Sequence, residues 1–315
     1  MATAATLADE VRAAKLRGIS RALSLVERGG EEAEALMAAL RGPGPRARLV
    51  GVTGAFGVGK STLVEALGTT LLRRGEKVAV LAVDPSSPFT GGALLGDRIR
   101  MNTFAALGGF VRSMATRGAL GGLAAAAADA VDVLEAAGFT WILVETVGVG
   151  QDEVDVATEV ETVVVTLMPG AGDDVQTAKA GLLEIGDVFA VNKADRPGAD
   201  AVVAALGGML DLAPAGRWRP PVVRTSARSG EGVEALLRAI EAHQEHLDAG
   251  GRREQKRRAR LGRRVEKLLA ALVLERTRRL DPARREAILV SSGDGGPDPY
   301  AAARRLFAAL FEEAP

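Results

Sequence analysis

Residues 49–74 read LVGVTGAFGVGKSTLVEALGTTLLRR, and this stretch decides the fold of the chain. The apolar run at 49–53 predicts a buried strand, and residues 62–74 have the spacing of a helix. Between them, residues 54–62 fit the phosphate-loop pattern GxxxxGK[ST], which needs a strand before it and a helix after it. The sequence therefore predicts a P-loop that binds a nucleotide.

The residue types in this loop suit phosphate oxygens. Glycines let backbone N–H groups converge on the phosphates, and the N-terminus of the following helix adds a favourable dipole. Lys60 supplies a positive charge, and the hydroxyl of Ser61 is typical of a Mg²⁺ ligand. We therefore expect the following residues to contact the phosphates: Gly54, Gly57, Val58, Gly59, Lys60, Ser61 and Thr62.

Short apolar runs alternate with helical patterns along the chain after this loop. Runs rich in Val, Ile and Leu are typical of strands buried on both faces, and helices between them indicate repeated βαβ units. The further predicted strands are residues 78–83, 141–145, 163–167, 188–192 and 222–225. The sequence therefore predicts an α/β protein, with a mostly parallel P-loop NTPase sheet flanked by helices.

The composition excludes several classes of function. Because there is no Cys among the 315 residues, the chain has no disulfide, no thiolate nucleophile and no Cys-based zinc site. The net charge of zero argues against a protein that works mainly by binding nucleic acid. No apolar run approaches the roughly 18 residues of a membrane span, and the charged N-terminus is not typical of a signal peptide. We expect a cytoplasmic protein with neither a membrane nor a nucleic acid as partner.

The segment Asn192-Lys193-Ala194-Asp195 follows a predicted strand, matches the pattern NKxD and indicates the base. The carboxylate of Asp195 can accept hydrogen bonds from the ring N–H and the exocyclic amine of guanine. Adenine would leave that carboxylate unmatched, which costs kilocalories. Lys193 would cover the plane of the base, and Asn192 would tie loops together. The sequence thus predicts GTP and GDP as ligands.

A second segment, Ser226-Ala227-Arg228, follows the predicted strand 222–225 and is a further candidate for contact with the base. The backbone N–H of Ala227 could donate to O6 of guanine. The alternative is that these residues form a plain turn between a strand and a helix.

Acidic residues at strand ends indicate where a metal ion would bind. Glu145 ends the strand 141–145 and begins the segment Glu145-Thr146-Val147-Gly148, which matches the DxxG pattern of GTPases with Glu in place of Asp. The N–H of Gly148 could sense the γ-phosphate. A carboxylate at a strand end could instead cap the next helix. The predicted Mg²⁺ ligands are Ser61, Asp84, Asp97 and Glu145.

Helical patterns flank the nucleotide-binding core. Residues 7–40 predict two helices that are separated at Gly29-Gly30, and a Pro-containing linker follows them. From Arg252 onward, apolar residues lie on one helical face and many Arg residues on the other. We therefore divide the chain into an N-terminal helical extension (1–48), a P-loop GTPase domain (49–248) and a C-terminal helical segment for dimerisation (249–315).

Four stretches of the sequence are more specific than these general motifs. They are residues 82–87 (AVDPSS), 91–98 (GGALLGDR), 144–151 (VETVGVGQ) and 169–176 (PGAGDDVQ). Together they closely resemble the MeaB/ArgK family, the G proteins that accompany methylmalonyl-CoA mutase and related adenosylcobalamin-dependent acyl-CoA mutases. The resemblance extends from about residue 10 to residue 250, and more loosely over the C-terminal helices.

The resemblance implies a P-loop GTPase of the SIMIBI class that is usually a homodimer. Such a protein protects the mutase and uses GTP to gate the loading of cobalamin, which is the mutase's cofactor, and the removal of damaged cofactor. The resemblance also makes residues 169–179 an additional switch. The chain departs from the family at Phe56, where Pro is common, and at Arg228, where a small or apolar residue is usual. Neither departure removes a phosphate or base contact.

Catalysis by the isolated protein is expected to be slow. No Gln directly follows Gly148, and no arginine finger can be assigned; a finger supplied in trans accelerates GTPases about 10³- to 10⁵-fold. Our hypothesis is that the mutase orders the switch loops and speeds hydrolysis. The candidate catalytic residues are Lys60, Glu145, Gly148 and Gln151, with Arg98 and Arg117 as further helpers.

Three alternatives of other classes stay open from the sequence. The first is a metal-insertion GTPase, for which the chain offers only His243 and His246, at a spacing that puts them on one helical face. The second is a P-loop kinase that acts on a protein or amino-acid acceptor. The third is a GTPase that binds nucleic acid through the basic residues 252–264, which could equally be a solvated face.

Overall fold

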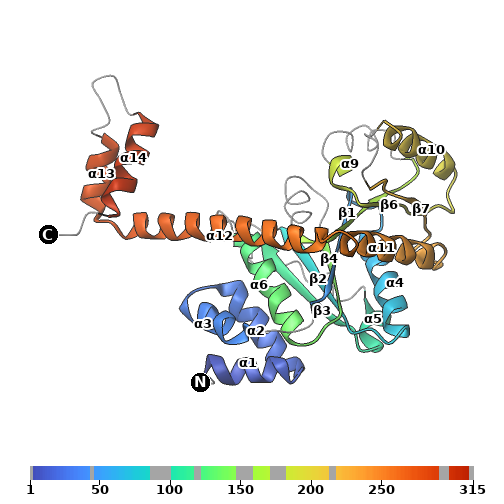
Figure 1. Cartoon of the computed structure of the whole chain (residues 1–315), viewed down its shortest axis with the longest axis horizontal. Helices are drawn as coiled ribbons and strands as arrows, with labels where there is room; N and C mark the ends of the chain where they lie inside the picture. Colours follow the sequence, from blue (N-terminus) through green and yellow to red (C-terminus); the bar gives the residue numbers. More distant parts are fainter. Residues whose placement is uncertain are drawn as a thin grey trace. The chain divides into compact units, whose positions relative to one another are not determined.

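The structure is a computed structural model that describes residues 3–42, 46–85, 101–116, 122–146, 159–170, 182–212, 218–290 and 298–311. Its centre is a seven-stranded sheet in the order β3-β2-β4-β1-β5-β6-β7, and every neighbouring pair of strands is parallel (Figure 1). The carboxyl ends of all the strands therefore lie at one edge, where ligands bind in α/β proteins. This arrangement confirms the predicted parallel sheet.

The elements have the following bounds. The strands are β1 (Arg48–Thr53), β2 (Val78–Pro85), β3 (Phe110–Thr116), β4 (Trp141–Thr146), β5 (Thr162–Leu167), β6 (Val188–Val191) and β7 (Val222–Arg224). The helices before β4 are α1 (Ala4–Arg12), α2 (Leu16–Arg28), α3 (Glu31–Leu40), α4 (Lys60–Arg73), α5 (Asn102–Ala106) and α6 (Gly122–Ala136). Those after β5 are α9 (Leu182–Ile185), α10 (Ala199–Leu210), α11 (Val233–Asp248), α12 (Arg252–Arg279), α13 (Pro282–Val290) and α14 (Pro299–Ala309).

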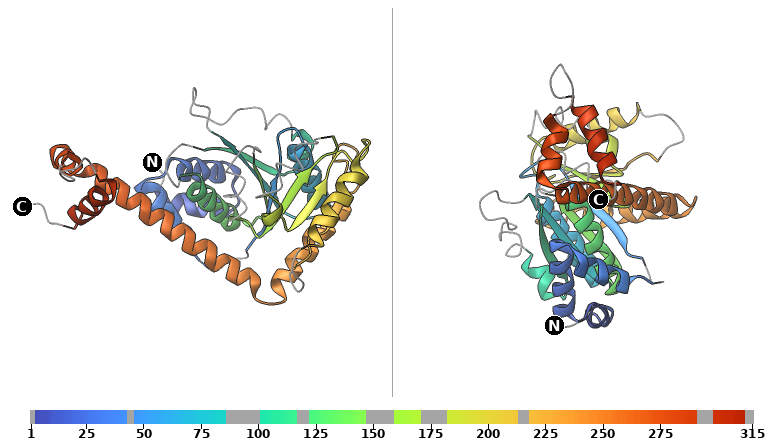
Figure 2. Two further views of the ribbon diagram at one scale, coloured as in Figure 1. Left: turned by 90° about the horizontal axis from the view of Figure 1, so that it is seen from above. Right: turned by 90° about the vertical axis from the view of Figure 1, so that its left-hand side faces the viewer.

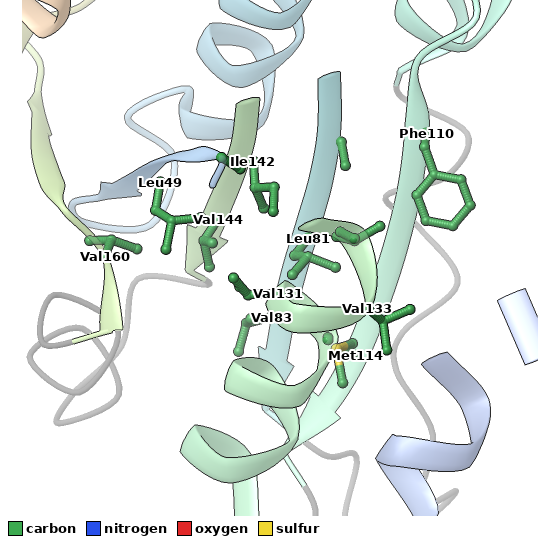
Figure 3. Close-up of a cluster of buried hydrophobic side chains, with 14 of the residues drawn as sticks. Leu49, Leu81, Val83, Phe110, Met114, Val131, Val133, Ile142, Val144 and Val160 are labelled. Carbon is green, nitrogen blue, oxygen red and sulfur yellow. The ribbon is translucent and has the colours of Figure 1, made fainter. Parts of the chain in front are cut away.

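Helices cover both faces of the sheet (Figure 2). On one face, side chains of α1–α3, α6 and α10 pack with alternate strand residues such as Leu49, Leu81 and Val144 (Figure 3). On the other face, α4, α5 and α11 pack against the intervening residues, including Val50 and Leu143. Both core clusters are buried, and each fully buried aliphatic side chain contributes about 1.5–3 kcal/mol. The double covering explains why the strands read as continuous apolar runs.

Two expectations about the outer elements were wrong. The N-terminal region holds three helices, because the chain also breaks between α1 and α2, where Ala14 adopts a left-handed φ of 53°. The edge strand β3 was not predicted at all. Among the described strands, only β2 pairs with it, and it carries the half-buried Arg112, which bonds to Glu27 of α2 at 2.7 Å. An ion pair in place of an apolar residue interrupts the pattern that marks the inner strands.

A buried polar network lies at the amino edge of the sheet, opposite the phosphate loop. Thr162, at the start of β5, bonds to Nδ1 of His243 at 2.9 Å and accepts from Nε2 of Gln244 at 2.6 Å. Nε2 of His243 lies 3.3 Å from Asp187, whose other carboxylate oxygen accepts from the N–H of Val163. The partners place the proton of a neutral His243 on Nε2, and burial lowers the pKa of His243 to about 3.

The first turns of α12 extend this network. Lys256 donates to the carbonyl of Glu161 at 2.8 Å, and Arg257 pairs with the Glu161 carboxylate at 2.8 Å. Arg253 bonds to Glu161 and to Asp248. Part of the basic stretch that sequence reasoning described as a solvated face or a nucleic-acid site is therefore neutralised by carboxylates of the same chain.

The described residues divide into two compact units. One contains most of residues 1–260, with the sheet and its covering helices, and the other contains the chain from Leu261 onward. In the second unit, α12 continues with exposed apolar side chains, and α13 and α14 follow it. The domain limits drawn from the sequence, at 48/49 and 248/249, stay predictions. Among the described residues, no helix is both long enough and apolar enough to cross a membrane.

Candidate nucleotide site

The phosphate loop connects β1 to α4 at the carboxyl edge of the sheet. Gly54 has φ 137°, and a Cβ placed on it would lie 2.1 Å from the carbonyl oxygen of Thr166, so only glycine fits. A Cβ on Gly59, which has φ 96°, would lie 2.5 Å from Nδ2 of Asn192. These close approaches explain both glycines that the motif requires.

Lys60 is the first residue of α4 and is buried beneath the loop. Its Nζ donates to the carbonyls of Gly54 at 2.7 Å and Ala55 at 2.9 Å, so the ammonium is held inside the loop. The N-terminus of α4 adds its positive dipole end at the same place. The arrangement can stabilise the negative charge of bound phosphates.

Ser61 and Glu145 bring oxygen atoms together beside the loop. The hydroxyl of Ser61 donates to Oε1 of the buried Glu145 at 2.5 Å. A hydroxyl next to a carboxylate is an all-oxygen donor set, which is the chemistry that Mg²⁺ prefers, so these residues fit the ion. Asp84 lies near the end of β2, which adjoins β4. Asp97, the fourth predicted ligand, lies outside the described residues.

Asn192 connects three loops at this edge. Its Nδ2 donates to the carbonyl of Val58 in the phosphate loop at 2.9 Å. Its Oδ1 accepts from the N–H of Ala227 at 3.0 Å and from the Thr225 hydroxyl at 3.3 Å. The geometry matches the expectation that Asn192 ties loops together. Because the Ala227 N–H already has a partner, contact between it and guanine O6 would need a shared hydrogen bond.

Lys193 has a left-handed backbone, with φ 55°, and its side chain runs back to the phosphate loop. Nζ donates to the carbonyl of Gly57 at 2.7 Å and lies 3.4 Å from Sδ of Met168. The side chain therefore spans the region between the NKxD segment and the loop. Asp195, two residues later, is exposed and near the surface turn that follows β6.

The structure thus brings Glu145, Asn192 and Lys193 into contact with the phosphate loop and the start of α4, whereas no such contact among the described residues places Asp195. Among the other residues predicted from the sequence, Ser226 and Ala227 are buried in the turn after β7, whereas Thr62 and Arg228 are exposed. The predicted Gly148, Gln151, Arg98 and Arg117 lie outside the described residues, as does most of the stretch 169–179.

Sequence reasoning assigned no role to Thr53 and Thr146, which lie at the ends of β1 and β4. The Thr146 hydroxyl donates to the Thr53 hydroxyl at 3.1 Å, and both residues are buried. The only signal in the sequence was a threonine at the end of each apolar run, next to the glycine-containing motifs.

Known proteins resemble this chain along most of its length. A "Putative GTPase" of Pyrococcus abyssi is 46% identical over 272 residues, covering 85% of this chain and 84% of the relative. The GTPase ArgK of Escherichia coli is 40% identical over 274 residues, 82% of each chain. The mouse protein named methylmalonic aciduria type A homolog, mitochondrial, is 38% identical over 217 residues, 66% of this chain and 52% of its own.

Solved structures support the same fold. A crystal structure of a LAO/AO transport system kinase superposes with a TM-score of 0.73 and 27% identity, and the match covers 98% of both chains. The family model described as methylmalonyl Co-A mutase-associated GTPase MeaB matches residues 19–281. Taken with the P-loop fold and the GTPase relatives, this match shows that the chain is a GTPase of the MeaB family.

Proposed function

We propose that this GTPase is a chaperone of an adenosylcobalamin-dependent acyl-CoA mutase of the methylmalonyl-CoA mutase type. In this role it gates the loading of the mutase's cofactor and protects or reactivates the mutase. The observation that carries the proposal is the match of the mutase-associated family over residues 19–281, which spans the whole nucleotide site. The name of the mouse relative, which refers to methylmalonic aciduria, points to a mutase that acts on the same methylmalonyl group.

The geometry of the site supports the nucleotide chemistry of this proposal. Lys60 and the N-terminus of α4 would hold the phosphates of GTP, and Asn192, Lys193 and Asp195 would hold the base. Ser61 and Glu145 would hold Mg²⁺, which supplies positive charge to the phosphate oxygens when it is bound. These contacts support the proposal that the site binds GTP together with Mg²⁺.

The proposal is tested by measuring phosphate release from GTP by the purified protein, alone and with methylmalonyl-CoA mutase from the same organism. We expect turnover that is selective for GTP over ATP and that rises when the mutase is added. An unrelated cobalamin enzyme serves as the control and should leave the rate unchanged. GTP turnover that the mutase does not alter, together with no complex between the two proteins, would contradict the chaperone role.

One observation favours a second candidate, a kinase acting on a protein or amino-acid acceptor. The LAO/AO transport system kinase covers almost the whole chain with the same fold. The two functions differ in where the γ-phosphate goes. With γ-labelled GTP and ATP, a hydrolase releases the label as inorganic phosphate, whereas a kinase leaves it on an acceptor.

We also propose that the chain forms a homodimer through α12. Leu261, Val265, Leu268 and Leu272 of this helix are exposed, with exposed fractions between 45% and 59%. Their spacing of four, three and four residues is that of a coiled-coil seam. A second copy would bury these side chains, because contiguous exposed apolar surface favours association.

The dimer is tested by light scattering on the full chain and on Leu268→Asp. The wild type should have the mass of two chains, and the variant should have the mass of one. Leu212→Asp is the matched control, since Leu212, two residues after the end of α10, is 84% exposed and outside the seam. A monomeric wild type, or a dimer that survives Leu268→Asp, would contradict the proposed interface.

A further inference from the structure

The last two residues of β4 are tied to two different parts of the molecule. Consecutive strand residues point to opposite faces of a sheet, so Glu145 and Thr146 face opposite sides. Glu145 accepts a hydrogen bond from Ser61 of α4, on the face that α4 covers. Thr146 follows Val144 on the other face and donates to Thr53 of β1 at 3.1 Å.

The two partners bracket the phosphate loop. Thr53 directly precedes Gly54, where the loop begins, and Ser61 directly follows Lys60, where α4 begins. The end of β4 is therefore fixed against both ends of the loop. The segment that follows Thr146 in the chain contains Gly148, the residue proposed to sense the γ-phosphate.

We propose that the hydroxyl pair of Thr146 and Thr53 is a positioning device for GTP hydrolysis. It fixes the end of β4, at Thr146, relative to the start of the phosphate loop, and Gly148 follows Thr146 by two residues in the sequence. The pairing of β4 with β1 ends at Val52 and Glu145, so the hydroxyl bond extends the contact between the two strands by one residue, to Thr53 at the start of the loop. The inference rests on the proposed role of Gly148 and on the GTPase activity of the family, and it needs no partner protein.

Because both threonines are buried, removing the hydrogen bond between them should have a measurable effect. Thr146 is 1% exposed and Thr53 is 2% exposed, so water cannot replace either hydroxyl when its partner is removed. Valine has nearly the shape of threonine but no hydroxyl, so Thr146→Val removes the bond and keeps the packing of the side chain. Losing a buried hydrogen bond of this kind corresponds to a change of about three- to tenfold in an equilibrium or rate.

The experiment measures kcat and KM for GTP in the full chain. For Thr146→Val we expect kcat to fall about three- to tenfold while KM and the affinity for GDP stay within about twofold. Thr146→Ser keeps the hydroxyl and should restore kcat. Thr53→Val removes the same bond from the other side, and the double variant should be no slower than either single variant, because both changes remove one interaction.

Thr166→Val on β5 is the matched control. Thr166 is fully buried on a strand next to β1, and its hydroxyl has no hydrogen-bond partner among the described residues. This change should leave kcat within about twofold of the wild type. If Thr166→Val is as slow as Thr146→Val, or if Thr146→Ser is as slow as Thr146→Val, the loss comes from packing and the inference is overturned.

A Gly148→Ala variant separates this inference from the proposal on which it rests. If Gly148→Ala hydrolyses GTP at the wild-type rate, the proposed role of Gly148 is wrong and the positioning role falls with it. If Gly148→Ala is slow but Thr146→Val keeps the wild-type kcat, only the positioning role is overturned. Slow hydrolysis by both variants, with rescue by Thr146→Ser, supports the inference.

Discussion

The two edges of the sheet use polar side chains in different ways. At the carboxyl edge, Lys60, Asn192 and Lys193 donate to backbone carbonyls of the phosphate loop. At the amino edge, Thr162 and His243 bond to other side chains within the interior. The first edge places polar groups around the loop that is predicted to hold phosphates, whereas the second pairs its polar groups with other side chains. The comparison teaches that a buried polar residue marks function only where its surroundings admit a ligand.

Lys60→Ala should show the largest difference in the contribution of the two edges to GTP turnover. Removing a buried cation that faces the phosphates should lower kcat/KM for GTP about 100-fold or more, since a preorganised charged donor stabilises developing charge strongly. The matched control is Lys256→Ala, which removes a lysine that bonds to Glu161 at the other edge. Steady-state kinetics should show a loss only for Lys60→Ala. Equal kinetic losses would mean that the edges are not functionally distinct.

Asp195→Ala tests whether the carboxyl edge selects the base. We expect the preference for GDP over ADP to fall about 100-fold, because two hydrogen bonds between a carboxylate and guanine are lost. Fluorescent analogues of both nucleotides measure the two dissociation constants. Asp211→Ala is the control, since that exposed carboxylate pairs with Arg219. A preference that survives Asp195→Ala would remove Asp195 from the base site.

Thr162→Val and Thr166→Val give the sharpest test of the amino edge, because both threonines are fully buried on β5. Thr162→Val deprives His243 and Gln244 of their partner and should destabilise the protein by about 2–4 kcal/mol. Thr166→Val removes a hydroxyl without a described partner and should change stability by about 1 kcal/mol or less. Urea unfolding followed by tryptophan fluorescence measures both. Similar losses for the two variants would show that the network contributes little.

The carboxyl edge could be predicted from sequence because its signals are local. Residues 54–62 and 192–195 are contiguous, and each follows an apolar run that gives a buried strand. The six strands with such runs were found for the same reason. Even the connecting role of Asn192 followed from its position in the NKxD pattern.

The amino edge could not be predicted because its contacts are long-range. Thr162 and His243 are 81 positions apart, and nothing near either residue indicates the other. The spacing of His243 and His246 suggested a helical face, but not that Trp218 packs against both rings at 5.0 Å. The break at Ala14 also carries no Gly or Pro, so local rules predicted one helix there.

The pH dependence of stability is the smallest effect and tests the amino edge alone. The pKa of His243 is about 3 in the folded protein, because burial disfavours the imidazolium, and about 6.5 in the unfolded chain. The unfolded state therefore binds more protons between these values. The contribution of His243 is fully present above pH 6.5 and is lost as the pH falls, by about 1.4 kcal/mol per pH unit.

Asp187 acts in the opposite direction. Burial raises the pKa of its carboxyl group, so the folded state holds that proton more tightly and gains stability as the pH falls through the raised pKa. The free energy of unfolding should therefore be measured from pH 7 to pH 5 for the wild type, His243→Gln and Asp187→Asn. His243→Gln should lose the fall in stability toward acid, and Asp187→Asn should fall most steeply toward acid. If all three profiles coincide, His243 and Asp187 do not titrate differently on unfolding. The amino edge would then owe its stability to hydrogen bonds whose strength does not depend on pH.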